Sequence, residues 1–364
     1  MPSRADPGDA RDGPHPGVEG SQPPMLTYLQ AIVIALVQGA TELFPVSSLG
    51  HSVLVPAWIG GSWETLVTQS SQQNSESSFY LAFLVALHVA TALALLWFFR
   101  TDWIRIVAGF FRSVRRSLGE RRLSVADDPD ERLAWLIVVA TIPVGITGVA
   151  LEHVFRTALA KPVAASAFLF VNGLILLAGD RFARRQRAAG RVARGQRAVE
   201  AAPAHAPEGE PRPAPALAAT GGRSAEDVAE AYDSDVRISR LPFTDALGVG
   251  ILQVFALFAG ISRAGITMVG GLWRGLSYED AARFAFLLAT PVILAAGVLK
   301  LPSLFGKAGD HIHGQVIVGM VVCGFVAYLS VRYLVKYFET RTLLPFAIYC
   351  LVAGAVSFIR FAAF

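Results

Sequence analysis

Apolar residues in this 364-residue chain gather into long runs that are separated by short polar or charged stretches. Six of these runs reach the roughly 18 residues that a helix needs to cross the hydrocarbon core of a bilayer. A helix also satisfies its own backbone N–H and C=O groups, which lipid cannot do. The pattern predicts an all-α polytopic membrane protein with spans at about 79–99, 133–151, 163–180, 282–300, 314–335 and 343–362.

Two further apolar regions, about 25–60 and 243–275, are interrupted near their middles by proline, glycine, serine and charge. Each is long enough for two half-crossings, but it is broken where a continuous helix would have to run. The two regions align without gaps, pairing Gln38 with Gln253, Pro45 with Gly260, Ser47 with Ser262, and Gly50 with Gly265. Broken segments at corresponding places in two halves indicate a binding site where the halves meet.

Each broken region is followed by three predicted spans, which indicates a duplicated unit of one re-entrant helical hairpin and three transmembrane helices. Because three is an odd number, the second repeat is predicted to be inverted relative to the first. The first hairpin then enters from outside and the second from the cytoplasm, which brings Glu42 and Arg263 together inside the membrane. The repeats are predicted at 25–185 and 241–364.

The segments outside the repeats are polar. Residues 1–24 are rich in Pro, Gly, Asp and Arg and lack the apolar core of a signal peptide, so a disordered N-terminal tail is predicted. Residues 186–240 are rich in Ala, Pro, Arg and Gly without apolar periodicity, which predicts a disordered, basic cytoplasmic linker. A small folded domain at 186–240 is the alternative interpretation.

Charge is scarce and unevenly placed: 16% of the residues are charged, against roughly a quarter in soluble domains. Positive residues concentrate after Arg100, after Arg181 and between the last two spans. All three stretches fall on one side if the spans alternate, and the positive-inside rule makes that side cytoplasmic. The same rule accounts for the net charge of +4, so nucleic acid is not an expected partner. Cys323 and Cys350 lie in apolar runs and are expected to be small buried hydrophobes.

Polar side chains gather in the first broken region. Gln38 and Glu42 are four residues apart and therefore share one helical face. A carboxylate in the hydrocarbon region is costly unless it faces a partner or a polar cavity, so Glu42 is either paired with an arginine or functional, as metal ligand or general base. Ser47 and Ser48 follow a helix-breaking proline, and His51 adds an imidazole suited to proton transfer near neutrality. The grouping favours the functional interpretation.

The second broken region has the composition of an anion site. Gly260 and Gly265 flank Ser262 and Arg263, and glycine-rich backbone at a helix start presents N–H groups to an anion. The planar guanidinium of Arg263 suits a phosphate or pyrophosphate. Ser262 and Thr267 add hydroxyl groups. This region therefore complements the acidic first region.

The motifs in these two regions resemble those of a known family. Residues 38–51, QGATELFPVSSLGH, resemble the first motif of the bacterial undecaprenyl-diphosphate phosphatase (bacitracin-resistance) family. Residues 259–267, AGISRAGIT, resemble the second motif, and segments 286–291 and 344–349 are also similar to the family. The resemblance runs over about 25–364, excluding the linker.

The resemblance implies hydrolysis of undecaprenyl diphosphate to the monophosphate, which recycles the lipid carrier of cell-wall synthesis. It implies a divalent cation, Mg²⁺ or Ca²⁺, near Glu42 and Gln38, and an active site facing the outer side of the bacterial cell membrane. The expected partners are a polyprenyl diphosphate substrate and membrane lipids, and a homodimer is compatible with the resemblance. By position, the matching catalytic residues are Glu42, Ser48, His51 and Arg263, and the surrounding substrate-binding residues are Ser47, Gly260, Ser262, Gly265 and Thr267.

Three positions depart from the family pattern. Gln38 stands where an acidic residue is more usual, which removes one negative charge that could hold a metal. Ala259 stands where the second motif has proline, and Ala264 where it has serine. Alanine at these two positions is compatible with an altered substrate or a lowered activity.

The residues suggest a phosphatase mechanism and two rival functions. The diphosphate would sit between the hairpins, with Arg263 stabilising the transferring phosphoryl group and Ser48 attacking it with His51 as acid–base partner. Direct attack by water, with Ser48 only binding phosphate, is the alternative route. A transporter or flippase is the main rival function, because paired re-entrant hairpins are also a transporter architecture. A non-catalytic polyprenyl-phosphate binder is the second. The acid, hydroxyl and imidazole groups favour the phosphatase, since anion transport needs only the arginine.

Overall fold

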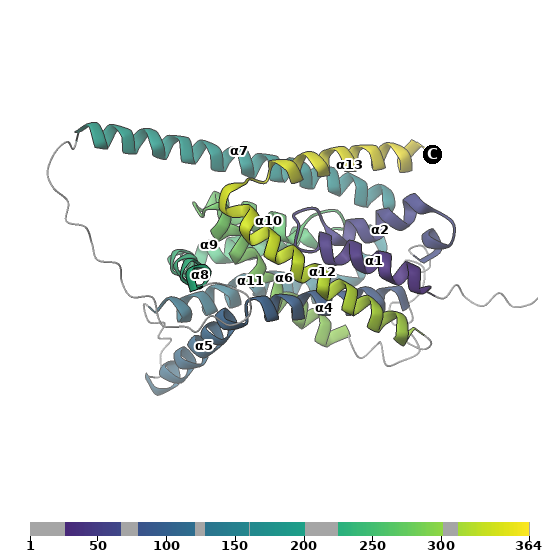
Figure 1. Cartoon of the computed structure of the whole chain (residues 1–364), viewed down its shortest axis with the longest axis horizontal. Helices are drawn as coiled ribbons and strands as arrows, with labels where there is room; N and C mark the ends of the chain where they lie inside the picture. The colour runs from purple at the N-terminus through teal and green to yellow at the C-terminus, as the bar shows by residue number, and fades with distance from the viewer. Residues whose placement is uncertain are drawn as a thin grey trace, which may run out of the picture.

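The spans predicted from the apolar runs are α-helices packed side by side (Figure 1). The computed structural model describes residues 26–66, 79–120, 128–159, 161–200, 225–300 and 312–363, and this part of the chain contains no β-strand. The predicted disordered tail at 1–24 lies outside the described residues. The long apolar helices are α4 (Phe79–Phe98), α6 (Pro129–Leu159), α7 (Pro162–Glu200), α11 (Tyr278–Lys300), α12 (His313–Thr340) and α13 (Leu344–Ala363).

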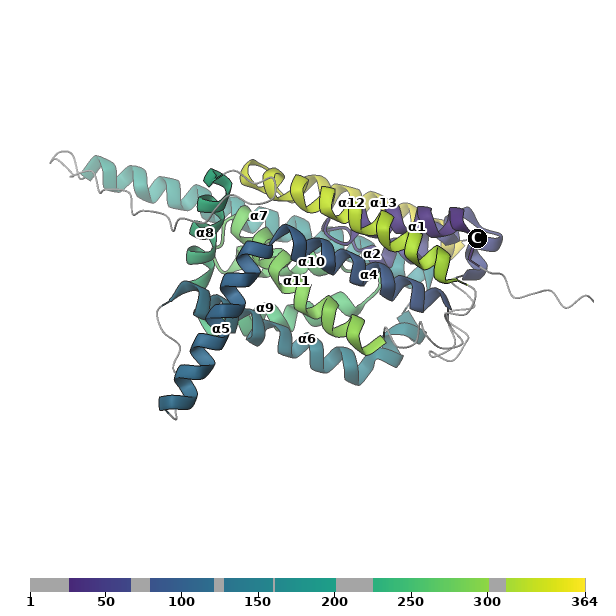
Figure 2. The ribbon, with the colours of Figure 1, turned by 60° about the horizontal axis from the view of Figure 1, so that its bottom comes forward.

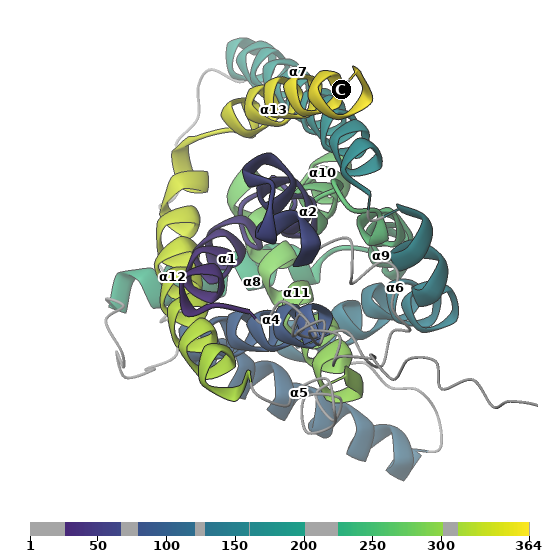
Figure 3. The ribbon, with the colours of Figure 1, turned by 90° about the vertical axis from the view of Figure 1, so that its right-hand side faces the viewer.

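These six helices are long and apolar enough to cross a membrane, and they confirm the six predicted spans. The chain is therefore a multi-pass, all-α membrane protein. Figure 3 shows α11 near the middle of the bundle, and α11 is also the most buried of the six. Helices α7 and α13 pack against each other along one side of the bundle, and Figure 1 shows α7 extending well past α13.

The two broken apolar regions form two pairs of short helices. The first pair is α1 (Tyr28–Thr41) and α2 (Ser48–Ile59), and the second is α9 (Phe243–Val254) and α10 (Arg263–Trp273), with a 3₁₀ turn at Phe255–Leu257. Helix α1 packs against α12, whereas α9 packs against α6. Each hairpin therefore packs against a membrane span from the other half of the chain. Duplication of the whole unit stays a prediction.

The segment predicted to be a disordered linker is partly helical. Helix α7 continues to Glu200, and α8 (Ala225–Ser239) packs against α6 and α11. Asp235 of α8 is fully buried, and it accepts hydrogen bonds from Arg283 and Arg105 at 2.7 and 2.8 Å. Composition suggested disorder because the buried face of α8 is half polar: Ser234 and Asp235 lie on it between Ala231 and Ile238. Residues 201–224 of the predicted linker lie outside the described residues.

The basic stretch after Arg100 is also helical. It forms α5 (Arg100–Glu120), which packs against α6. Figure 2 shows α5 and α8 at the same end of the bundle as the free end of α7. That end also carries Arg332 and Lys336, in the last turns of α12, and Arg341, between α12 and α13. The positive residues therefore share one end, which we name the arginine-rich end.

Candidate active site

The unwound tips of the two hairpins meet in the interior of the bundle. The backbone N–H of Gly260 donates to Ser47 Oγ at 3.1 Å, which joins residues 213 positions apart. A Cβ atom on Gly50 would lie only 3.0 Å from Gly260 Cα. Gly260 itself has φ +113°, a conformation that side chains disfavour, and a Cβ there would lie 2.4 Å from the Ala165 carbonyl oxygen. Glycine at position 50 therefore lets the tips touch, and glycine at position 260 lets the second tip pack against α7.

The helices that leave the junction begin in the same way. Ser47 caps α2 by accepting a hydrogen bond from Gly50 N–H at 3.3 Å. Ser262 caps α10 by accepting one from Gly265 N–H at 3.1 Å. Ser47 has φ 70°, which is unusual for a residue with a side chain and is held by its contacts to both hairpins. Two helix N-termini, with their positive dipole ends, thus face the junction.

Asn172 of α7 holds the two tips together from behind. Its Nδ2 donates to the Pro45 carbonyl at 3.0 Å, and its Oδ1 accepts from Ser262 N–H at 3.0 Å. The side chain is fully buried. The sequence prediction missed this residue, although a lone asparagine inside an apolar span is a signal, because a buried amide must find polar partners.

Glu42, where α1 ends, is the centre of the polar contacts. One carboxylate oxygen accepts a hydrogen bond from the guanidinium of Arg263. The other accepts from Ser48 Oγ and, at 2.9 Å, from Gln38 Nε2. The side chain of Glu42 is buried, so these donors replace the water that a carboxylate requires. The structure therefore brings together four of the residues that the sequence singled out.

His88 of α4 is a further contact of Glu42 that the sequence prediction missed. Its Nε2 lies 3.3 Å from Glu42 Oε2. Its Nδ1 lies 2.7 Å from the Leu84 carbonyl and must donate its proton there. Nε2 can therefore donate to Glu42 only when the ring is an imidazolium. The available signal was an ionisable side chain inside a predicted span, which is rare without a function.

His51 is turned away from this cluster. Its Nδ1 donates to the Ser47 carbonyl at 2.7 Å, and its Nε2 accepts from the Tyr349 hydroxyl at 2.7 Å. The two rings stack with centroids 5.7 Å apart. Both ring nitrogens are therefore occupied, and within the described residues no side-chain hydrogen bond joins His51 to Ser48. The predicted pairing of Ser48 with His51 thus has no hydrogen bond in this structure.

The remaining predicted residues lie along the start of α10. Gly265 comes close to the first hairpin, since a Cβ there would lie 3.2 Å from the Pro45 Cβ. Thr267 is buried, and its hydroxyl has no hydrogen-bond partner in the part of the chain that is described. Ala259 and Ala264, the two departures from the motif, are buried, and neither lines the cavity beside Glu42.

The cavity beside the junction has a volume of about 280 Å³. Its polar wall includes Glu42, Ser48, His88 and Arg263. Its other walls are mostly apolar and come from α6, α11 and the 3₁₀ turn, including Val144, Leu257, Val292 and Ala296. A cavity with a charged wall facing apolar walls suits an amphiphile whose anionic group is carried on a hydrocarbon chain.

The donor set at the junction fits a divalent cation that shares its ligands with a substrate. Within the described residues no three His, Cys, Asp or Glu side chains are grouped as a metal site. Gln38 Oε1, however, is buried without a hydrogen-bond partner, and the same amide contacts Glu42. Mg²⁺ is commonly held by one or two carboxylates together with substrate phosphate oxygens. Glu42 and Gln38 supply one carboxylate and one spare amide oxygen.

Comparison with known proteins gives consistent matches over nearly the whole chain. The family model described as bacitracin resistance protein BacA matches residues 31–202 and 216–356. The chain is 56% identical over 347 residues to undecaprenyl-diphosphatase 2 of Frankia alni, covering 93% of this chain and 98% of the relative. It is 52% identical to undecaprenyl-diphosphatase of Mycolicibacterium paratuberculosis (92% and 97% covered), and 37% identical to undecaprenyl-diphosphatase 1 of Burkholderia pseudomallei (89% and 93% covered).

Proposed function

The chain belongs to the bacitracin resistance protein BacA family, and from that premise we propose that it is an undecaprenyl-diphosphatase. The reaction consumes undecaprenyl diphosphate and water and yields undecaprenyl phosphate and inorganic phosphate. The observation that carries the proposal is the contact of Glu42 with Ser48 and Arg263 on the polar wall of an otherwise apolar cavity. This arrangement offers a nucleophile, a base and a phosphate ligand to a lipid.

The substrate lies with its diphosphate at the hairpin junction and its prenyl chain along the apolar walls. One arm of the Arg263 guanidinium contacts Glu42. Within the described residues the other guanidinium nitrogens have no partner, and they can donate to phosphate oxygens. The N-termini of α2 and α10 add favourable dipoles for the same anion.

Ser48 is the nucleophile in the first step. Its Oγ forms a bond to the terminal phosphorus, and its proton passes to Glu42, which already accepts its hydrogen bond. The bond from this phosphorus to the bridging oxygen breaks, and undecaprenyl phosphate leaves with that oxygen. Arg263 stabilises the charge on the transferring group.

Water completes the reaction by attacking the phosphoserine. The phosphorus bond to Ser48 Oγ breaks, one proton of the water goes to Oγ, and Glu42 gives its proton to the departing phosphate. Glu42 is thereby a carboxylate again. His88 acts through Glu42: as an imidazolium it stabilises the carboxylate, and it can hold a proton beside it.

A bound Mg²⁺ or Ca²⁺ ion, held by Glu42 and Gln38 with phosphate oxygens, would neutralise diphosphate charge. The proposal includes this cation because the Gln38 amide oxygen is the spare acceptor next to the carboxylate. The substitution of glutamine for a second acid predicts a cation requirement at higher concentration than two carboxylates would give.

We place the protein in the bacterial cell membrane with this cavity nearer the outer side. The positive-inside rule puts the arginine-rich end in the cytoplasm. Helix α11 starts at that end, and its cavity-lining residues Val292–Gly297 lie towards its other end. His88 lies at the middle of α4, about equally far from the two ends of that helix. Substrate would therefore enter from the outer leaflet.

A matched pair of serine variants tests the nucleophile. Ser48→Ala should lower phosphate release from undecaprenyl diphosphate by at least roughly 10³-fold. Ser52→Ala, one turn further along α2, should leave it unchanged, because Ser52 Oγ has no hydrogen-bond partner among the described residues. Near-normal release by Ser48→Ala would instead favour direct attack by water. No release by folded wild-type protein with either cation would contradict the enzyme and leave transport or simple binding.

A further inference from the structure

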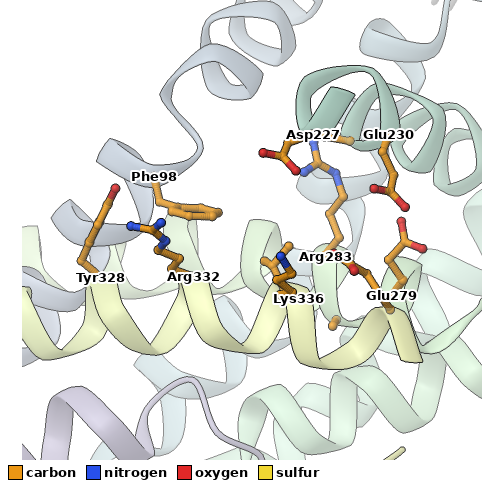
Figure 4. A pocket seen from close by; sticks show the side chains of 12 residues that line it. Phe98, Asp227, Glu230, Glu279, Arg283, Tyr328, Arg332 and Lys336 are labelled. Carbon is orange, nitrogen blue, oxygen red and sulfur yellow. The ribbon is translucent and has the colours of Figure 1, made fainter. Parts of the chain in front are cut away.

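A second cavity lies at the arginine-rich end, away from the hairpin junction. It has a volume of about 200 Å³ and is formed by the end of α4, by α8, by the start of α11 and by the end of α12 (Figure 4). None of its lining residues lines the cavity beside Glu42. The proposed phosphatase reaction therefore makes no use of it.

Opposite charges occupy different ends of this second cavity. Figure 4 shows Arg332 beside Phe98 and Tyr328 at one end, Glu230 at the other, and Lys336 between them. Glu339 is a further carboxylate of the lining.

Four charged side chains of the lining have no ion-pair partner within 4.0 Å in the part of the chain that the structure describes. They are Arg332, Lys336, Glu230 and Glu339. Other charges of the same lining are neutralised by the protein. Arg283 pairs with Asp235 at 2.7 Å, and Glu279 pairs with Arg237 at 3.2 Å. The cavity thus keeps two cations and two carboxylates that form no ion pair with each other, as a site for a ligand carrying both signs of charge would.

An apolar groove of about 410 Å³ adjoins this cavity on the outer surface of α4 and α12. The groove is lined by Leu93, Gly324 and Phe325, and it shares Tyr328 with the charged cavity. Leu93 and Phe325 are exposed by 52% and 64%, on the surface that faces lipid. One end of the combined site is therefore charged and the other is open to acyl chains.

Aromatic residues mark the level at which the two parts meet. Trp97 lines the groove, and the Arg100 guanidinium lies 5.1 Å from the centre of its ring. Tyr328 packs edge-on against Phe98, with ring centroids 5.9 Å apart. Tryptophan and tyrosine are enriched where headgroups meet hydrocarbon. The charged cavity therefore lies at headgroup depth and the groove at acyl depth.

We propose that the cavity and groove together bind one phospholipid with a phosphoethanolamine headgroup. Its phosphate contacts Arg332 and Lys336, its ammonium contacts Glu230 and Glu339, and one acyl chain lies along the α4–α12 groove. An anionic lipid without an amine would leave the carboxylates unpaired and repelled. A choline headgroup has no N–H to donate to them.

Native mass spectrometry of the detergent-purified full chain, given equal amounts of dioleoyl phosphatidylethanolamine, phosphatidylglycerol and phosphatidylcholine, tests this site. Wild type should retain the ethanolamine lipid about tenfold more than the other two, a difference of about 1.4 kcal/mol. The double variant Arg332→Gln/Lys336→Gln should lose that excess. Arg341→Gln, at the same end of α12 but outside the lining, is the matched control and should keep it.

Two further variants separate the headgroup from the acyl chain. Glu230→Gln/Glu339→Gln should abolish the preference for ethanolamine over glycerol while retaining lipid. Gly324→Leu should reduce retention of all three lipids by filling the groove; a Cβ at Gly324 meets only Ala90, at 3.6 Å, and leucine favours the helix, so folding is preserved. Equal retention of the three lipids by wild type would overturn the proposal. Unchanged ethanolamine-lipid retention in the Arg332/Lys336 variant or in Gly324→Leu would also overturn it.

Discussion

The two hairpins start their inner helices alike but contribute different chemistry. In each, a serine caps the helix and accepts a hydrogen bond from a glycine N–H three residues later. The first hairpin supplies the carboxylate of Glu42 and the hydroxyl of Ser48, whereas the second supplies the cation of Arg263. Neither charge would be tolerated alone at this depth. The site therefore exists only where the hairpins meet, because the charge of each hairpin neutralises that of the other.

The largest expected effect comes from breaking the charge pair between the hairpins. Glu42→Ala leaves the partly buried Arg263 without its carboxylate partner, and Arg263→Ala leaves the buried Glu42 without its guanidinium partner. Removing one member of a buried pair costs about 3–5 kcal/mol of the free energy of unfolding. The double variant should lose less than the sum of the single losses, as measured by thermal unfolding in detergent. Additive losses would show that the two groups are independent.

At Gly260, packing of the second hairpin tip against α7 can be separated from backbone strain. Gly260→Ala should lower the free energy of unfolding by about 3 kcal/mol, because φ is +113° and the new Cβ meets the Ala165 carbonyl at 2.4 Å. Gly275→Ala is the control: its φ is +87°, but nothing lies within 4 Å of the new Cβ. It should lose only about 1 kcal/mol, from strain alone. Equal losses in the same unfolding assay would mean that the second tip is not tightly packed against α7.

A third prediction compares the two histidines near the first hairpin. His88→Gln removes the ring facing Glu42 and should lower phosphate release about 10²-fold, within the range for acid–base groups. His51→Gln removes contacts to Ser47 and Tyr349 and should lower release by less than about tenfold. The reverse order of the two losses would return the acid–base role to His51.

The smallest expected effect concerns the residue that departs from the acidic pattern of the family. Gln38→Glu places a second carboxylate beside Glu42. The Mg²⁺ concentration that gives half-maximal phosphate release should fall about tenfold, since added ligand charge strengthens binding of hard cations. Gln38→Leu, which removes the amide oxygen, should raise that concentration. An unchanged requirement in both variants would remove Gln38 from the cation site.

Much of this architecture could be predicted from local patterns in the sequence. Uninterrupted apolar runs gave the six spans, because a helix is the structure that satisfies its backbone in lipid. The odd number of spans after each broken region predicted opposed hairpins that bring Glu42 and Arg263 together, and the structure has the two side chains in contact. The spans could be predicted from short stretches of sequence and from the membrane as solvent, whereas this contact was predicted from the order of the elements along the chain.

The missed features depend on contacts between segments that are far apart along the chain. His88 belongs to no motif, and only the packing of α4 brings it to Glu42. His51 lies close to Ser48 in sequence, but its hydrogen bonds to Ser47 and Tyr349 turn it elsewhere. Helix α8 looked disordered because Asp235 finds its arginines on other helices. Side-chain direction and distant ion pairs are not encoded in local periodicity.

We propose that dephosphorylation occurs where the two hairpins meet. The decisive measurement is phosphate release from undecaprenyl diphosphate by the detergent-purified protein, with Mg²⁺ or Ca²⁺, in wild type, Glu42→Ala and Arg263→Ala. We predict cation-dependent release by wild type and a loss of at least roughly 10²-fold in each variant, although one lies on each hairpin. Near-normal release by either folded variant would contradict a shared site at the junction.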